Sequence, residues 1–157
     1  MGRMQNYEYK TKPFKHQIQA LQRGAEAYNF AYFMEMGTGK TKVAIDNVCY
    51  LFQQKKINTV VVIAPNSVYR NWIDEIHLHA PFQCHINTHK MDKKFVQDKI
   101  KLNFYLINVE AFSHQSGANI LKNIMNQHGK TMCTIVDEST TIKTVSYTHL
   151  RAHETNQ

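Results

Sequence analysis

The sequence predicts an α/β fold in which helices cover both faces of a parallel sheet. Apolar runs of strand length alternate with stretches whose apolar residues recur at helical spacing, as in repeated βα units. A glycine-rich loop lies between one such strand and the next helix, where α/β sheets often bind phosphate groups. At 157 residues, 43% of them apolar, the chain can bury one core and is too short for a second domain of equal size.

Five segments are predicted as strands because they are short, apolar and rich in β-branched or aromatic residues. They are, in chain order, residues 30–34, 59–64, 84–88, 104–109 and 131–136. Three helices are predicted between them from apolar residues that fall on one helical face. The faces consist of Val43, Ala44, Val48, Leu51 and Phe52 within residues 40–52, then Val68, Trp72 and Ile76, then Ile120, Leu121, Ile124 and Met125.

The segment Met-Glu-Met-Gly-Thr-Gly-Lys-Thr, which begins at Met34, is the second half of a phosphate-binding loop. Gly37 and Gly39 would let backbone N–H groups close around phosphate oxygens. Lys40 would reach the β- and γ-phosphates, and the Thr41 hydroxyl would ligate Mg²⁺. The full motif has a further glycine where this chain has Met34, so a flexible turn before a helix is the alternative.

Two carboxylates, Asp137 and Glu138, follow the last predicted strand. At a Mg²⁺-nucleotide site, Asp137 would hold the metal through its water shell, and Glu138 would orient and deprotonate the attacking water. An isolated Asp-Glu pair after a strand is also typical of an exposed turn. Its occurrence together with the loop favours the nucleotide site, with Lys40 and Glu138 as the catalytic residues.

The net charge of +7 and the pI near 9.3 suit a polyanionic partner such as nucleic acid, or the nucleotide itself. A solvated basic face explains the charge equally well. Cys49, Cys84 and Cys133 lack paired spacing and lie in or beside apolar runs, which indicates reduced thiols in a cytoplasmic protein. No apolar run is long enough for a bilayer, and the N-terminus lacks a signal-peptide hydrophobic region, so no membrane partner is expected.

A group of histidines and one cysteine offers a rival metal site: His77, His79, Cys84, His85 and His89. Their spacing matches no familiar zinc pattern. Cys84 and His85 are neighbours on a predicted strand and should face opposite sides, so the metal site is disfavoured.

With the loop and the acid pair placed, the chain resembles the first RecA-like domain of a superfamily 2 helicase, in particular the Swi/Snf-type and phage DEAD-like DNA translocases. The resemblance runs from about Lys12 to Lys143. The segment from Phe33 to Thr41 resembles the helicase form of the loop, in which an acidic residue and Met commonly precede Gly-x-Gly-Lys-Thr. The resemblance implies a RecA-like P-loop NTPase domain, ATP and Mg²⁺ as ligands, DNA or RNA as partner, and nucleotide contacts that include Thr38.

The segment Pro13-Phe14-Lys15-His16-Gln17 resembles the glutamine motif of the same family. By this resemblance the Gln17 amide would read the adenine edge. A surface amide on a first helix is the alternative.

Two further segments resemble strand-contact motifs of the family. Residues 60–68 with Trp72 resemble motif Ia, and Asn108-Val109-Glu110-Ala111-Phe112-Ser113 resembles the next contact with the tracked strand. Ser67 would also be placed to cap the following helix. Trp72 is interpreted as a core anchor rather than a base-stacking residue. Contacts with nucleic acid are expected from Pro65, Asn66, Ser67, Asn108 and Glu110.

The string after Lys143 has no clear amphipathic period and resembles translated sequencing-adapter read-through. We therefore expect a domain at residues 1–143 and a non-native or disordered tail at 144–157, with a divergent helical tail as the alternative. The resemblance also implies a second RecA-like domain, absent here, that closes over the γ-phosphate and supplies arginine fingers. Weak nucleotide binding with little turnover is expected for this chain, and rival functions are a protein-remodelling P-loop ATPase or a binding module without turnover.

Overall fold

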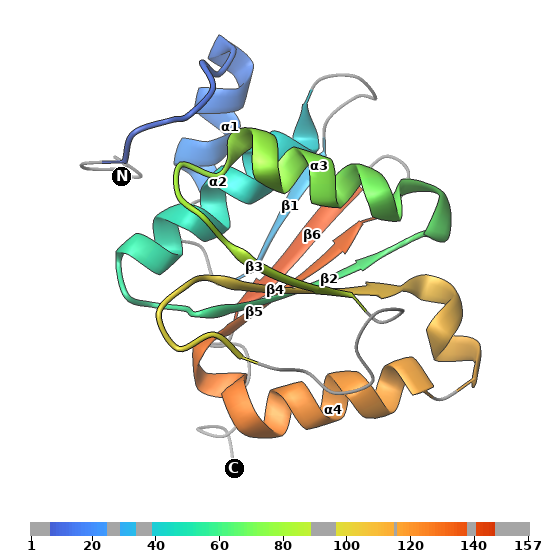
Figure 1. Cartoon of the computed structure of the whole chain (residues 1–157). Coiled ribbons are helices and arrows are strands. Elements are labelled where there is room, and N and C mark those ends of the chain that lie inside the picture. The colour runs from blue at the N-terminus through green and yellow to red at the C-terminus, as the bar shows by residue number, and fades with distance from the viewer. Residues whose placement is uncertain are drawn as a thin grey trace.

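The computed structural model describes residues 7–24, 29–33, 39–88, 97–114, 116–137 and 141–146. These residues form a six-stranded sheet with helices packed against both faces (Figure 1). The strand order is β1-β6-β5-β2-β4-β3. The strands are β1 (Asn29–Phe33), β2 (Thr59–Ala64), β3 (His85–Thr88), β4 (Asn103–Asn108), β5 (Met132–Asp137) and β6 (Thr141–Ser146). The five predicted strands are confirmed, each within one residue at either end.

The strands β3, β4, β2 and β5 run parallel, as predicted. A sixth strand that was not predicted, β6, pairs antiparallel with both β5 and β1, so it adds an antiparallel member to the predicted parallel sheet. Only three residues, 138–140, join β5 to β6. A parallel pairing needs a crossover connection of a dozen residues or more, so this short link permits only the antiparallel pairing. Because β6 runs against both neighbours, β1 runs in the same direction as β5.

Strand β6 also crosses the domain boundary that the sequence predicts after Lys143. Residues 144–146 continue β6 past that boundary: Thr144 and Val145 pair with both neighbouring strands, and Ser146 pairs with β5. Residues 147–157 lie outside the described residues, and a non-native tail there stays a prediction.

Helices α1 (Lys15–Gly24), α2 (Lys40–Gln53) and α3 (Tyr69–His79) cover one face of the sheet, and α4 (Ser116–His128) covers the other (Figure 1). Side chains of each strand alternate between the two faces. In β2, Val60 and Val62 belong to the core beneath α1, α2 and α3, and Val61 belongs to the core against α4. Burial on both faces explains why the strands read as continuous apolar runs. Short 3-10 turns, η1 (Asn66–Val68), η2 (Val109–His114) and η3 (Gly129–Thr131), complete the elements.

Residues 7–11, here called the N-terminal segment, are tied to α2 by a buried charged network. The Tyr7 hydroxyl donates to Asp46 Oδ1 at 2.6 Å. Lys42 Nζ donates to Asp46 Oδ2 at 2.8 Å and to the Thr11 carbonyl oxygen at 3.0 Å. Burial raises the pKa of the Asp46 carboxyl, although the hydrogen bonds from Lys42 and Tyr7 oppose the rise. The network anchors the helix that begins with Lys40, and no sequence pattern predicted it.

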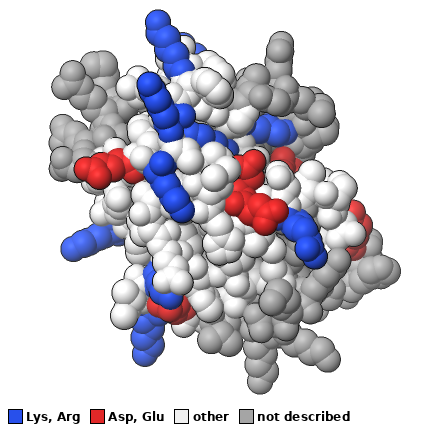
Figure 2. All heavy atoms as spheres, turned by 45° about the horizontal axis from the view of Figure 1, so that its top comes forward, with Lys and Arg blue, Asp and Glu red and all other residues white. Residues whose placement is uncertain are grey.

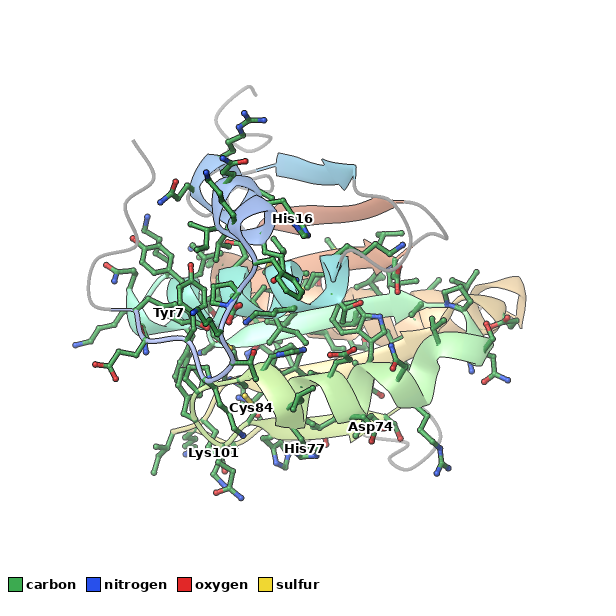
Figure 3. All side chains as sticks on the ribbon, turned by 90° about the horizontal axis from the view of Figure 1, so that it is seen from above. Tyr7, His16, Asp74, His77, Cys84 and Lys101 are labelled. Atoms are coloured by element: carbon green, nitrogen blue, oxygen red, sulfur yellow. The ribbon has the colours of Figure 1, made fainter. Side chains whose placement is uncertain are left out.

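The same segment contacts α3. Figure 3 shows the chain running from Tyr7 toward the end of α3 that carries His77 before it turns into α1. Lys10 Nζ donates to the His77 carbonyl oxygen at 2.7 Å, and the Thr11 hydroxyl lies 2.6 Å from His79 Nδ1. The N-terminal segment therefore connects α2 with α3. Across the part of the chain that the structure describes, no helix is long and apolar enough to cross a membrane.

A buried thiol on β5 should make the fold sensitive to alkaline pH. Burial raises the pKa of Cys133 from 9.0 to about 12. Between these values the unfolded chain releases this proton and the folded chain keeps it, so stability is lost as pH rises, by up to about 1.4 kcal/mol per pH unit. We expect Cys133→Ala to flatten the decline of unfolding free energy between about pH 9.5 and 10.5, measured by urea denaturation. Ile135→Val, which trims the same strand without removing a thiol, should keep the original slope; equal slopes for all three proteins would contradict the prediction.

Candidate functional site

The site lies at the edge of the sheet where the parallel strands end. Strands β2, β4 and β5 finish there with Ala64, Asn108 and Asp137. Because β1 runs in the same direction as β5, its last residue, Phe33, lies at this edge. The predicted phosphate loop and the predicted acid pair thus follow strands that end on the same side, as in other open α/β sheets.

Gly39 sets the geometry where the phosphate loop enters α2. Its φ of 78° and ψ of 36° place it in the left-handed region, which favours glycine. A Cβ added here would lie 2.0 Å from Nε2 of Gln17. No side chain caps the helix at this residue. Gly39 has no side chain that could accept hydrogen bonds from the first N–H groups of α2. These groups suit an anion such as a phosphate.

Lys40 and Asp137 come together although they are far apart in the sequence. Lys40 is the first residue of α2, Asp137 is the last residue of β5, and Lys40 Nζ lies 3.7 Å from Asp137 Oδ1. Their side chains are 15% and 9% exposed, so the two charges lie in a largely water-excluded place where they interact strongly. This proximity is what the combination of phosphate loop and acid pair predicts.

Gln17 lies on the phosphate loop from the side of α1. Its Nε2 donates to the Gly39 carbonyl oxygen at 3.3 Å, and its Oε1 accepts from the Phe14 backbone N–H at 2.7 Å. The side chain is buried, so the alternative of a surface amide was wrong. Gln17 does lie on the first helix, α1, but its amide is hydrogen-bonded to Gly39 and so joins this helix to the phosphate loop. A contact with an adenine edge stays a prediction.

The remaining nucleotide residues are only partly described. Thr41 follows Lys40 on the first turn of α2 and is half-buried, next to the place where Lys40 meets Asp137. Gly37, Thr38 and Glu138 lie outside the described residues. The structure therefore brings together Gln17, Gly39, Lys40, Thr41 and Asp137.

Trp72 belongs to this site through a contact that the sequence analysis did not anticipate. It is 1% exposed, which confirms its interpretation as a core anchor. In addition, its indole Nε1 donates to Asp137 Oδ2 at 2.8 Å. The sequence could have indicated only that Trp72 needs a hydrogen-bond acceptor, because a buried indole N–H usually has one. The identity of that acceptor depends on how α3 packs over β5.

The predicted nucleic-acid residues lie at the same edge but differ in exposure. Asn66 and Ser67 are exposed in η1, directly after β2, and Pro65 is half-buried. Ser67 does not cap α3, because the helix begins after Val68 and has no side-chain cap; the intervening 3-10 turn displaces the serine.

On the neighbouring strand, the two predicted contact residues behave differently. Asn108 is buried, and its Oδ1 accepts from the Ala111 backbone N–H at 2.9 Å, which holds the start of η2. Glu110 is exposed. Their contacts with nucleic acid stay a prediction.

The surface charge does not by itself mark a nucleic-acid face. On the face in Figure 2, Lys and Arg side chains project separately and acidic side chains lie between them, so the described residues visible there form no continuous basic area. The members of the histidine group that the structure describes, His77, His79, Cys84 and His85, do not gather into a metal site. His79 Nε2 lies 2.6 Å from Glu75 Oε2, and within the described ranges no three His, Cys, Asp or Glu side chains gather closely enough to hold a metal.

The residues present fit a Mg²⁺-nucleotide complex. Mg²⁺ prefers oxygen ligands, and the Asp137 carboxylate and the Thr41 hydroxyl supply them at one end of the sheet. Lys40 offers a cation to the phosphates, and Gly39 provides a backbone position that a Cβ would obstruct. The donor set therefore fits a phosphate group and a hard metal ion.

Comparisons with known proteins identify the family and the fold. A family model described as the SNF2-related domain matches residues 16–154, a range that runs beyond Lys143. The chain is similar in structure to the Sulfolobus solfataricus SWI2/SNF2 ATPase core in complex with dsDNA, with a TM-score of 0.56 and 20% identity over 64% of this chain. It spans 22% of that solved chain, and no curated protein matches the sequence. The likeness confirms the RecA-like α/β fold, and because the family model covers most of its length, the chain belongs to the SNF2-related domain family.

Proposed function

We propose that this chain is the ATP-binding half of an ATP-dependent DNA translocase or helicase. The observation that carries the proposal is the meeting of Lys40 and Asp137 at 3.7 Å, beside a left-handed Gly39, in a member of the SNF2-related domain family. The fold alone would not suffice, since one fold serves many functions. The combination of phosphate-binding backbone, cation and carboxylate favours nucleotide chemistry.

Each residue has a defined part in this proposal. The first N–H groups of α2 and the Lys40 ammonium bind the β- and γ-phosphates. Thr41 and Asp137 hold Mg²⁺, which when bound neutralises charge on the phosphate oxygens. Gln17 supports the loop through the Gly39 carbonyl oxygen and presents its amide to the adenine.

Hydrolysis and movement require further groups. Glu138 orients and deprotonates the attacking water. A second RecA-like domain supplies arginine fingers and closes over the γ-phosphate, so this chain alone should bind nucleotide weakly and turn it over slowly. The exposed residues Asn66, Ser67 and Glu110, with Pro65, contact the nucleic-acid backbone. The partner is DNA, as the solved relative binds dsDNA, and RNA is the alternative to test.

The proposal is tested by binding of a fluorescent ATP analogue with Mg²⁺ to the purified chain. We expect Lys40→Ala to weaken binding about a hundredfold, because a charge-assisted contact to phosphate is lost. Lys56→Ala is the matched control: it removes the same charge from an exposed lysine beyond the other end of α2 and should bind as the original chain does.

Adding single- or double-stranded DNA, or RNA, to the same assay tests the partner. A change in nucleotide affinity with nucleic acid, absent in Lys40→Ala, would support a translocase or helicase. Coupling to a protein substrate instead would favour a protein-remodelling ATPase. Equal binding by the original chain and Lys40→Ala would overturn the proposed nucleotide site.

A further inference from the structure

We infer that Trp72 is a positioning residue for Asp137: its indole N–H holds one carboxylate oxygen so that the other faces Lys40 and the phosphate loop. The inference rests on the proposed function, in which Asp137 is the metal-holding carboxylate. It assigns a role in nucleotide and metal binding to a side chain of α3, a helix that does not carry the phosphate loop or the acid pair.

The two oxygens of Asp137 have different partners. Trp72 Nε1 donates to Oδ2 at 2.8 Å, and Lys40 Nζ lies 3.7 Å from Oδ1. The Trp72 side chain is 1% exposed and Asp137 is 7% exposed, so water does not readily replace the indole as a donor. An indole N–H can only donate, so Oδ2 is the acceptor in this hydrogen bond. The hydrogen bond to Oδ2 therefore fixes the orientation of the carboxylate and, with it, the position of Oδ1.

The donor itself is held rigidly. Trp72 belongs to the large core cluster with Ile76, one turn further along α3. The end of α3 is bound to the N-terminal segment, because Lys10 Nζ donates to the His77 carbonyl oxygen and Thr11 pairs with His79. A donor fixed by packing and by backbone contacts orients a metal ligand far better than a mobile one does. Hydrogen bonds of this kind to a ligating group change metal affinity by about 10- to 100-fold when they are removed.

The first test examines the hydrogen bond without any ligand. Trp72 is the only tryptophan of the chain, so a ¹H–¹⁵N NMR spectrum contains a single indole signal. A hydrogen bond to a carboxylate should move this signal downfield, and Asp137→Asn should return it toward the position of a neutral acceptor. An indole signal that does not change in folded Asp137→Asn would overturn the inference, whether or not the chain binds nucleotide.

The second test examines the metal. In Trp72→Phe, which keeps an aromatic ring in the core but has no donor, we expect the Mg²⁺ concentration needed for half-maximal binding of the ATP analogue to rise about 10- to 100-fold. Binding of the analogue in EDTA should stay within about twofold of the original chain. Ile76→Val, a packing change on the same helix, should leave both quantities unchanged.

The outcomes separate this inference from the proposed function. If the original chain shows no Mg²⁺-dependent binding, the proposed function fails, and the role of Trp72 toward the metal fails with it. If the original chain binds with Mg²⁺ and Trp72→Phe shows the same Mg²⁺ requirement, only the positioning role is overturned. If Trp72→Phe does not fold, the first test still applies: the indole signal of Asp137→Asn shows whether the Trp72 N–H is hydrogen-bonded to the Asp137 carboxylate.

Discussion

Asp46→Ala should lower the free energy of unfolding by about 3–5 kcal/mol, measured by urea denaturation at neutral pH. The substitution leaves the Lys42 ammonium buried, with the Thr11 carbonyl oxygen as its remaining partner among the contacts of this network. Lys42 is 5% exposed, so water cannot readily solvate the charge, and an unpaired buried charge carries a penalty of this size. Small domains are stable by only about 5–15 kcal/mol, so the variant should stand close to unfolding.

Two matched variants identify the cause. Tyr7→Phe removes only the hydroxyl that donates to Asp46 Oδ1 and should cost about 1.5–3 kcal/mol. Lys42→Met combined with Asp46→Leu removes both charges and should recover most of the stability, because apolar residues often replace a buried ion pair without loss. A double variant as unstable as Asp46→Ala would show that packing, rather than the unpaired charge, determines the effect.

Gly39→Ala should disable the phosphate loop, with binding of the Mg²⁺-ATP analogue weakened at least about tenfold and unfolding free energy lowered by about 2–3 kcal/mol. A side chain in the left-handed region costs about 1–2 kcal/mol. The new Cβ would also lie 2.0 Å from Gln17 Nε2 and 3.3 Å from its Cδ, so the amide that holds the loop must move and lose a hydrogen bond. Titration with the fluorescent analogue and urea denaturation measure the two effects.

Gly129→Ala is the control, since Gly39 has the only positive φ among the glycines that the structure describes. It should leave nucleotide binding unchanged. Adding Gln17→Ala to Gly39→Ala should restore part of the stability by relieving the close contact, although the backbone strain at residue 39 remains. If Gly39→Ala binds the analogue as tightly as the original chain does, the close approach of backbone to phosphate is not needed here.

The sequence determined the elements that depend on local pattern. Strand β2 was predicted residue for residue, at Thr59–Ala64, because its six apolar or β-branched residues are bounded by Asn58 and Pro65, which are typical of turns. Helix α2 was predicted to begin at Lys40 because a glycine precedes its apolar stripe. The pairing of Lys40 with Asp137 was predictable as well, since both follow strands of a parallel sheet and therefore share one edge.

Tertiary structure alone decided the features that join distant segments. Strand β6 runs antiparallel because three residues connect it to β5. Four of its six residues are β-branched, which favours a strand, but this local pattern does not specify its partner strands. The Tyr7–Asp46–Lys42 network and the Trp72–Asp137 hydrogen bond join residues 39 and 65 positions apart. A residue's own neighbours in sequence reveal that a Trp N–H or an Asp carboxylate needs a partner when buried, but which partner it meets is fixed only when the helices pack on the sheet.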